Sequence, residues 1–265
     1  MTPEPQPGSR RTSARSTTLF QRLLALSGFA FAVLLVLSWF LSGGDAPDYT
    51  ASDEDWTTWA GGNRYRSGIG ASLILLGGVA FLHFAATIRS ALESAETTVR
   101  GSGTLGHAAF GGALVGITGI GIALVTVASA TSEGADADPG AIRAVATASA
   151  GPYLVAAMGF AAFLGAAGLS TLRSGSFPRW TGVVALVGAV AFLITFLTLV
   201  AGAGEDSVFG YGFLPGILAL VIWLFGFMHG WALVGIGGFR RLRAGSVAGS
   251  ARRFGIRGRG AGPSR

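Results

Sequence analysis

Long apolar runs alternate with short polar segments along most of this sequence. Six runs contain no Asp, Glu, Lys or Arg, and each has the roughly 20 residues that a helix needs to cross a hydrocarbon core of about 30 Å. Backbone groups in lipid must be satisfied within the protein, so each run should be helical. We therefore predict an all-α, polytopic transmembrane bundle with six spans. The spans are expected at about 23–44, 67–88, 107–130, 150–172, 180–203 and 211–236.

The composition supports a membrane protein and excludes several kinds of chemistry. Apolar residues make up 51% of the chain and charged residues 12%, about half of the charged fraction of soluble proteins. Cysteine is absent, which excludes disulfides, thiolate metal sites and a cysteine nucleophile. All basic side chains are Arg, a bias that we interpret as GC-rich codon usage in a bacterium.

The distribution of arginine predicts the orientation. With the N-terminus in the cytoplasm and six spans, 16 of the 19 Arg lie on the inner side, while ten of the 13 acidic residues lie on the outer side. Basic residues near span ends favour the cytoplasmic side. We therefore expect a multi-pass protein of the cell membrane with both termini in the cytoplasm.

Two polar tails flank the predicted transmembrane domain at 19–240. Residues 1–18 and 241–265 are rich in Gly, Ser and Arg, a composition typical of disordered segments. Arg side chains close to the inner leaflet are attracted to anionic lipid headgroups. The tails are thus expected to contact lipid, and no nucleic acid is expected as a partner.

Small residues recur at four-residue spacing inside several predicted spans, where they allow helix backbones to approach closely. We favour packing within one chain, and a homo-oligomer through these Gly-rich faces is the alternative. The rows are Gly112 and Gly116; Ala157, Ala161 and Gly165; and Gly226 and Gly230.

The first outer loop carries five acidic residues and the pattern of a helix start. Ser52 precedes three consecutive acids, as expected for an N-cap followed by a favourable first turn. Trp56 and Trp59 would share one face of a short interfacial helix, with their rings at headgroup level. Arg64 and Arg66 are candidates to pair with the acids. The spacing lacks a calcium-loop pattern, so no metal site is expected.

His83 and His229 lie inside the predicted spans, and the third histidine, His107, lies close to the inner end of the third span; ionisable residues in a membrane are functional candidates by default. His83 and His229 both lie near the inner ends of their spans, so they could ligate haem b from two helices, with Arg89 reaching a propionate. We favour a neutral imidazole that hydrogen-bonds a backbone carbonyl or a neighbouring hydroxyl. A proton relay is a third interpretation.

Three motifs are similar to those of a family of uncharacterised bacterial six-pass integral membrane proteins, across about residues 18–240. They are Gly44-Asp45-Ala46-Pro47-Asp48 with Trp56, Phe84-Ala85-Ala86-Thr87-Ile88-Arg89, and Arg173-Ser174-Gly175 leading to Pro178-Arg179-Trp180-Thr181-Gly182. The family has no assigned activity, so the resemblance implies a fold and no catalytic residue.

Three functions are compatible with these patterns. The first is a non-catalytic membrane component, which we favour because no Walker loop, G-x-S-x-G or H-E-x-x-H motif is present. The second is a small-molecule permease or channel without ion coupling, since no span carries a carboxylate. The third is a b-type haem protein that uses His83 and His229.

Overall fold

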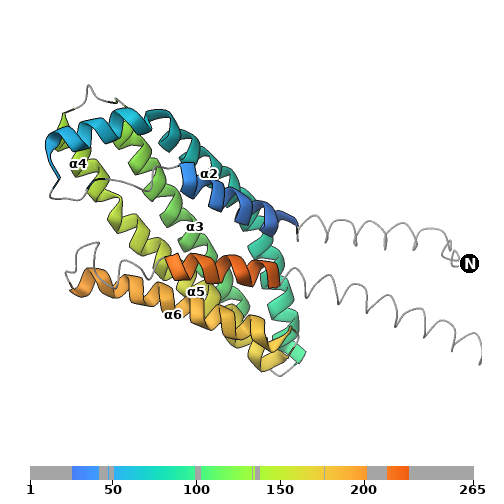
Figure 1. The fold of residues 1–265 in the computed structure, drawn as a ribbon. Helices are drawn as coiled ribbons and strands as arrows, with labels where there is room; N and C mark the ends of the chain where they lie inside the picture. Colours follow the sequence, from blue (N-terminus) through green and yellow to red (C-terminus); the bar gives the residue numbers. More distant parts are fainter. Residues whose placement is uncertain are drawn as a thin grey trace, which may run out of the picture.

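The computed structural model describes residues 26–41, 47, 51–98, 103–132, 134, 138–175, 177–201 and 214–226, and these residues form no β-strand. The all-helical class is therefore confirmed for this part of the chain. The labelled helices are α2 (Asp53–Thr98), α3 (Thr104–Thr131), α4 (Pro139–Ala148), α5 (Ala150–Ser174) and α6 (Arg179–Ala201) (Figure 1). Two shorter apolar helices cover Leu26–Leu41 and Leu214–Gly226.

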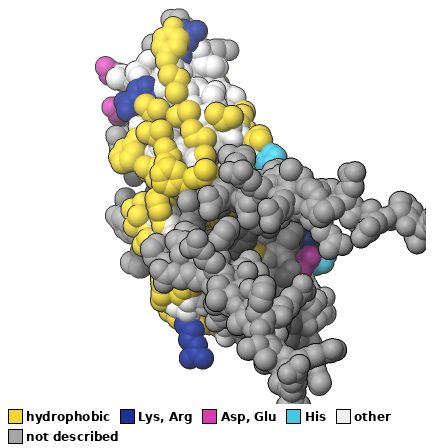
Figure 2. All heavy atoms as spheres, turned by 90° about the vertical axis from the view of Figure 1, so that its right-hand side faces the viewer, with side chains coloured by type: hydrophobic (Ala, Val, Ile, Leu, Met, Phe, Trp, Pro, Cys, Tyr) yellow, Lys and Arg dark blue, Asp and Glu magenta, His cyan; other side chains and the backbone are white. Residues whose placement is uncertain are grey.

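Four helical stretches are long and apolar enough to cross a membrane: Asp53–Glu93, Thr104–Thr131, Pro139–Ser174 and Arg179–Leu197. With the two shorter helices, they coincide with all six predicted spans. Figure 2 shows hydrophobic side chains over the coloured part of one face, with charged side chains near its ends. These features support a membrane-embedded protein. The predicted tails and the 227–236 part of the sixth span lie outside the described residues.

Helix α2 is longer than the predicted span at 67–88. It has 46 residues, and the Asp53–Glu93 part alone extends for about 60 Å at the usual helical rise. A hydrocarbon core is only about 30 Å thick, so this helix is about twice as long as a single span needs. The predicted interfacial helix and the second span are therefore one continuous element.

Helices α2, α3, α5 and α6 run in alternating directions (Figure 1), and the main contacts join α2 to α3, α3 to α5 and α5 to α6. Helix α4 was not predicted. It precedes α5 directly and contacts both α2 and α3. Asp138 begins it, because its Oδ1 accepts a hydrogen bond of 2.9 Å from the Ala141 amide, and Pro139 occupies the first turn, where its missing N–H is not needed.

Glycines bring the backbones of α3 and α5 into direct contact. A Cβ atom on Gly159 would lie 2.6 Å from Gly116 Cα and 2.8 Å from the Gly112 carbonyl oxygen. A Cβ atom on Gly119 would lie 2.5 Å from the Ala156 nitrogen. Real Cβ atoms do not approach other atoms so closely, so this contact requires glycine.

The preferred interpretation of the Gly112–Gly116 row, packing within one chain, is therefore confirmed. Its partner on α5 is Gly159, which does not belong to the predicted row at Ala157, Ala161 and Gly165. Gly226 also packs within the chain, against the Trp180 ring, and Gly230 lies outside the described residues.

Aromatic rings fill the middle of the bundle. The Phe81 ring centroid lies 4.4 Å from that of Phe31, 5.4 Å from Phe163 and 6.0 Å from Phe160. The Trp223 ring lies 5.3 Å from Phe163. These contacts fasten the two shorter helices to α2 and α5. All members of this aromatic cluster are almost completely buried: Phe31, Phe81, Phe84, Phe160, Phe163, Phe192 and Trp223.

Candidate functional site

The first candidate residue, His83, lies on an exposed face of α2. Its Nδ1 is 2.8 Å from the Val79 carbonyl oxygen. Because a carbonyl oxygen only accepts hydrogen bonds, Nδ1 is the donor in this contact. The expected hydrogen bond from the imidazole to a backbone carbonyl is thus present at His83. His229 lies outside the described residues, so the pairing of the two histidines stays a prediction.

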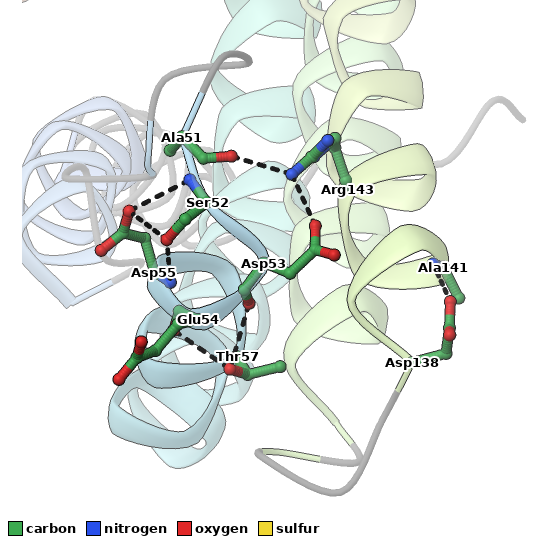
Figure 3. A network of polar contacts seen from close by, with 9 residues as sticks. All are labelled: Ala51, Ser52, Asp53, Glu54, Asp55, Thr57, Asp138, Ala141 and Arg143. Atoms are coloured by element: carbon green, nitrogen blue, oxygen red, sulfur yellow. Dashed lines mark hydrogen bonds and ion pairs between the residues drawn. The ribbon is translucent and has the colours of Figure 1, made fainter.

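The start of α2 forms a reciprocal capping arrangement (Figure 3). The Asp55 amide donates to Ser52 Oγ at 3.2 Å, while the Ser52 amide and hydroxyl donate to Asp55 Oδ2 at 3.1 and 2.7 Å. Two amides that have no partner inside the helix are satisfied in this way. The predicted helix start at Ser52 is confirmed.

Arg143 on α4 fastens this start to the rest of the bundle (Figure 3). Its Nη2 donates to the Ala51 carbonyl at 2.8 Å and to Asp53 Oδ1 at 2.9 Å. The sequence offered no signal for this contact, because the partners are about 90 residues apart. Hydrogen bonds to a charged guanidinium are stronger than neutral ones, so Arg143 stabilises the junction between α2 and α4.

The prediction that Arg64 and Arg66 pair with the loop acids was wrong for Asp53, which pairs with Arg143. Arg66 donates instead to the Phe40 carbonyl at 3.4 Å. Arg64 and Arg66 lie on later turns of α2. Arg143 lies on α4, which was not predicted, and it is within hydrogen-bonding distance of Asp53 in the first turn of α2.

Trp56 and Trp59 share one helical face, as predicted, but that face is turned into the protein. They are only 2% and 7% exposed and pack with Ala60 and with Ile142 of α4. The two rings meet edge to face, with centroids 5.7 Å apart. The rings, expected at headgroup level on an interfacial helix, are thus not exposed, because α4 covers them.

We expect Arg143→Gln to loosen the first turn of α2 without unfolding the bundle. The substitution removes a charged donor from two acceptors, at a cost of about 1 kcal/mol for a partly exposed contact. Amide hydrogen exchange at 53–56 should become roughly fivefold faster. The control is Arg64→Gln, because Arg64 is exposed and lies over the Tyr65 ring. Equal exchange in both variants would contradict a role for Arg143.

A second polar cluster, at the other end of α2, was not predicted. Arg89 donates from Nε to Glu93 at 2.6 Å and from Nη2 to His107 Nε2 at 2.7 Å. Since Nε2 accepts, the proton of His107 is on Nδ1, which lies 3.0 Å from the Gly103 carbonyl. Arg89 also stacks on the Phe110 ring at 5.7 Å. This Arg89 cluster links the last turns of α2 to the first turn of α3.

The carboxyl of Glu93 lies beyond the apolar segment at 67–88 and is ionised in the cluster. The hydrogen bond from Arg89 is the main cause that lowers its pKa below the usual 4.5, and the charge of Arg89 acts in the same direction, against partial desolvation. A carboxyl whose pKa is lower in the folded state than in the unfolded state stabilises the fold at pH values above the unfolded-state pKa. This stabilisation is lost as the pH falls through the folded-state pKa.

We therefore expect Glu93→Gln to lower thermal stability in detergent near neutral pH and to have little effect in acid. Below the lowered pKa, the wild-type carboxyl is protonated too, so the two proteins should converge. Thermal unfolding of both proteins across this pH range measures the difference. A difference that persists unchanged in acid would show that the ion pair is not its cause.

The described residues contain no group of three or more His, Asp or Glu that could hold a metal ion. The acids at the start of α2 and α4 serve as caps and as a partner of Arg143. Comparison with protein-family models, curated proteins and solved structures finds no match.

Proposed function

We propose that this protein is a multi-pass component of the bacterial cell membrane with a structural role and no catalytic or transport activity. The observation that carries the proposal is the aromatic cluster in the middle of the bundle. Rings from α2, α5, α6 and both shorter helices meet there. A pathway for a solute between these helices would have to displace closely packed rings, whose interlocking gives protein interiors their rigidity.

The buried polar side chains of the described helices also favour this proposal. All of them are hydroxyls: Ser38, Ser67, Thr131, Ser149, Ser170, Thr171, Thr181 and Thr195. Transporters and proton relays place ionisable groups inside the bundle, and the described helices bury no His, Asp, Glu or Arg side chain. No contact in the described residues therefore favours the permease interpretation.

Flux measurements test the proposal. The purified protein, reconstituted in vesicles of neutral and anionic phospholipid, should pass ions, sugars and amino acids no faster than protein-free vesicles do. Phe81→Ala, which opens the aromatic cluster, is the variant to compare with wild type, because it tests whether the cluster closes a pathway. A solute that enters wild-type vesicles above background, and enters differently with the variant, would overturn the proposal.

The proposed topology has six spans and cytoplasmic termini, with the Arg-rich tails on anionic headgroups. A phosphatase or fluorescent reporter fused after Arg265 tests it. We expect cytoplasmic fluorescence and no phosphatase activity from this position, whereas a phosphatase fused in the segment between α3 and α4 should be active. The opposite result would show that the orientation is the reverse of the one proposed.

Haem b binding is the second candidate, and one contact favours it. In haem and metal sites, a ligating imidazole commonly donates its other N–H to a carbonyl, which sets the ring orientation. His83 makes this type of contact with Val79, so Nε2 is available to a ligand. A Soret band in protein expressed with haem, lost in His83→Ala and kept in His107→Ala, would support haem. A spectrum without this band excludes it.

A further inference from the structure

Helix α3 presents an outward-facing apolar stripe that no described helix covers. Its residues recur every three or four positions, so they share one face of the helix. Most of the stripe is hydrophobic and exposed, and Thr118 lies at its centre. The stripe consists of Gly111, Leu114, Val115, Thr118, Ile122 and Val125.

The hydroxyl of Thr118 differs from five other exposed or half-buried hydroxyls of α2 and α3. Each of those donates to the carbonyl four residues earlier, at 2.8 to 3.2 Å: Ser72, Thr87, Ser90, Thr126 and Ser129. Thr118 makes no hydrogen bond to any residue that the structure describes. A hydroxyl without a partner in hydrocarbon is costly, and lipid chains provide no acceptor.

Thr118 also lines a groove between α2 and α3. The groove has a volume of about 410 Å³ and apolar walls that include Leu75, Val79, Ile122 and Val125. Gly78 and Ile117 also line it, and they are in close contact, since a Cβ on Gly78 would be 2.9 Å from the Ile117 side chain. The exposed stripe is therefore bordered by a cleft that can receive apolar side chains.

We propose that this face binds a second copy of the chain, with α3 against α3. In a symmetric membrane dimer the twofold axis lies along the membrane normal, so every residue meets its counterpart at the same depth. Thr118 is near the midpoint of the 28-residue helix and lies opposite Thr118 of the second copy. A threonine hydroxyl both donates and accepts, so it is complementary to its own copy.

The shape of the stripe fits the same partner. A Cβ on Gly111 would touch nothing within 4 Å, so this glycine, two helical turns before Thr118, is not required by packing within the chain. It leaves space for the partner's backbone. Ile122 and Val125 of each chain lie beside the groove and can insert into that of the partner, as knobs pack into holes.

Cysteine cross-linking tests this arrangement, because the chain has no native cysteine. Thr118→Cys and Val125→Cys, introduced singly into the full chain in native membranes, should each give a disulfide-linked dimer after oxidation. The control is Val187→Cys, on an exposed face of α6. Absence of the dimer for both α3 variants, or equal yields at Val187, would overturn the proposal.

A second measurement does not depend on disulfide geometry. Thr118→Val keeps the shape and removes the hydroxyl, whereas Thr118→Ser keeps the hydroxyl. Energy transfer between labelled copies, diluted stepwise in phosphatidylcholine vesicles, should show a dimer roughly three- to fifteenfold weaker for Thr118→Val. Thr118→Ser should remain close to wild type. Equal association of all three proteins, or a wild-type monomer that retains a bound lipid, would exclude the Thr118 contact.

Discussion

Replacing Gly159 by alanine is expected to destabilise the bundle by about 3 kcal/mol or more, at the upper end of the usual cost of overpacking. The added Cβ would lie 2.6 Å from Gly116 Cα and 2.8 Å from the Gly112 carbonyl oxygen. Backbone atoms cannot move aside as a flexible side chain can, so α3 and α5 would have to separate. This pair forms the most extensive helix contact of the described bundle.

Gly151→Ala is the matched control for this prediction, because it makes the same change on the same helix where a Cβ meets nothing within 4 Å. Alanine favours a helix over glycine by about 0.8–1.0 kcal/mol, so this variant should be as stable as wild type or slightly more stable. Unfolding by SDS in mixed micelles, followed by circular dichroism, compares the two. Equal loss of stability in both variants would contradict the close contact of α3 with α5.

The helices of the apolar runs could be predicted from the sequence because the signal for such a helix is local. An uncharged run of about 20 apolar residues has few alternatives to a helix in lipid, and the structure places helices in all six runs. The start of α2 at Asp53 could be predicted, because Ser52 has the pattern of an N-cap. Nothing in the sequence between Trp59 and Ser67 shows that this turn continues directly into the span.

The contacts made by helix α4 could not be predicted, because they join residues far apart in the chain. Its ten residues are too few for a span, and Arg143 within them carries no mark of its distant partner Asp53. The burial of Trp56 could not be predicted for the same reason, because Ile142 of α4 packs against it. The small-residue rows indicated close packing, but only the structure shows that Gly112 and Gly116 meet Gly159.

The Arg89 cluster shows a similar limit. The sequence places Arg89 and His107 on either side of one turn, which brings them to the same end of the bundle. It does not show that the guanidinium is already held by Glu93 and His107, which occupies two of its nitrogen atoms. The expectation that Arg89 would reach a haem propionate did not consider these partners.

Phe81→Ala should cost about 3 kcal/mol, at the lower end of the range for buried phenylalanine. Phe81 is fully buried, and its ring contacts Phe31, Phe160 and Phe163. Because lipid is as apolar as the core, the loss comes from dispersion contacts and from the cavity, with little contribution from transfer to water. The shorter Leu26–Leu41 helix should detach first, since Phe31 loses its closest ring.

The control for Phe81→Ala is Leu76→Ala, on the same helix, where the side chain is 62% exposed. Lipid chains can fill the space that this leucine leaves, so the variant should lose less than about 1 kcal/mol. SDS unfolding measures both costs, and a cysteine at Phe29 labelled before and after the change reports whether the Leu26–Leu41 helix has moved. If both substitutions cost the same, the aromatic cluster is not what holds the helices together, and the proposal of a closed, structural bundle loses its main support.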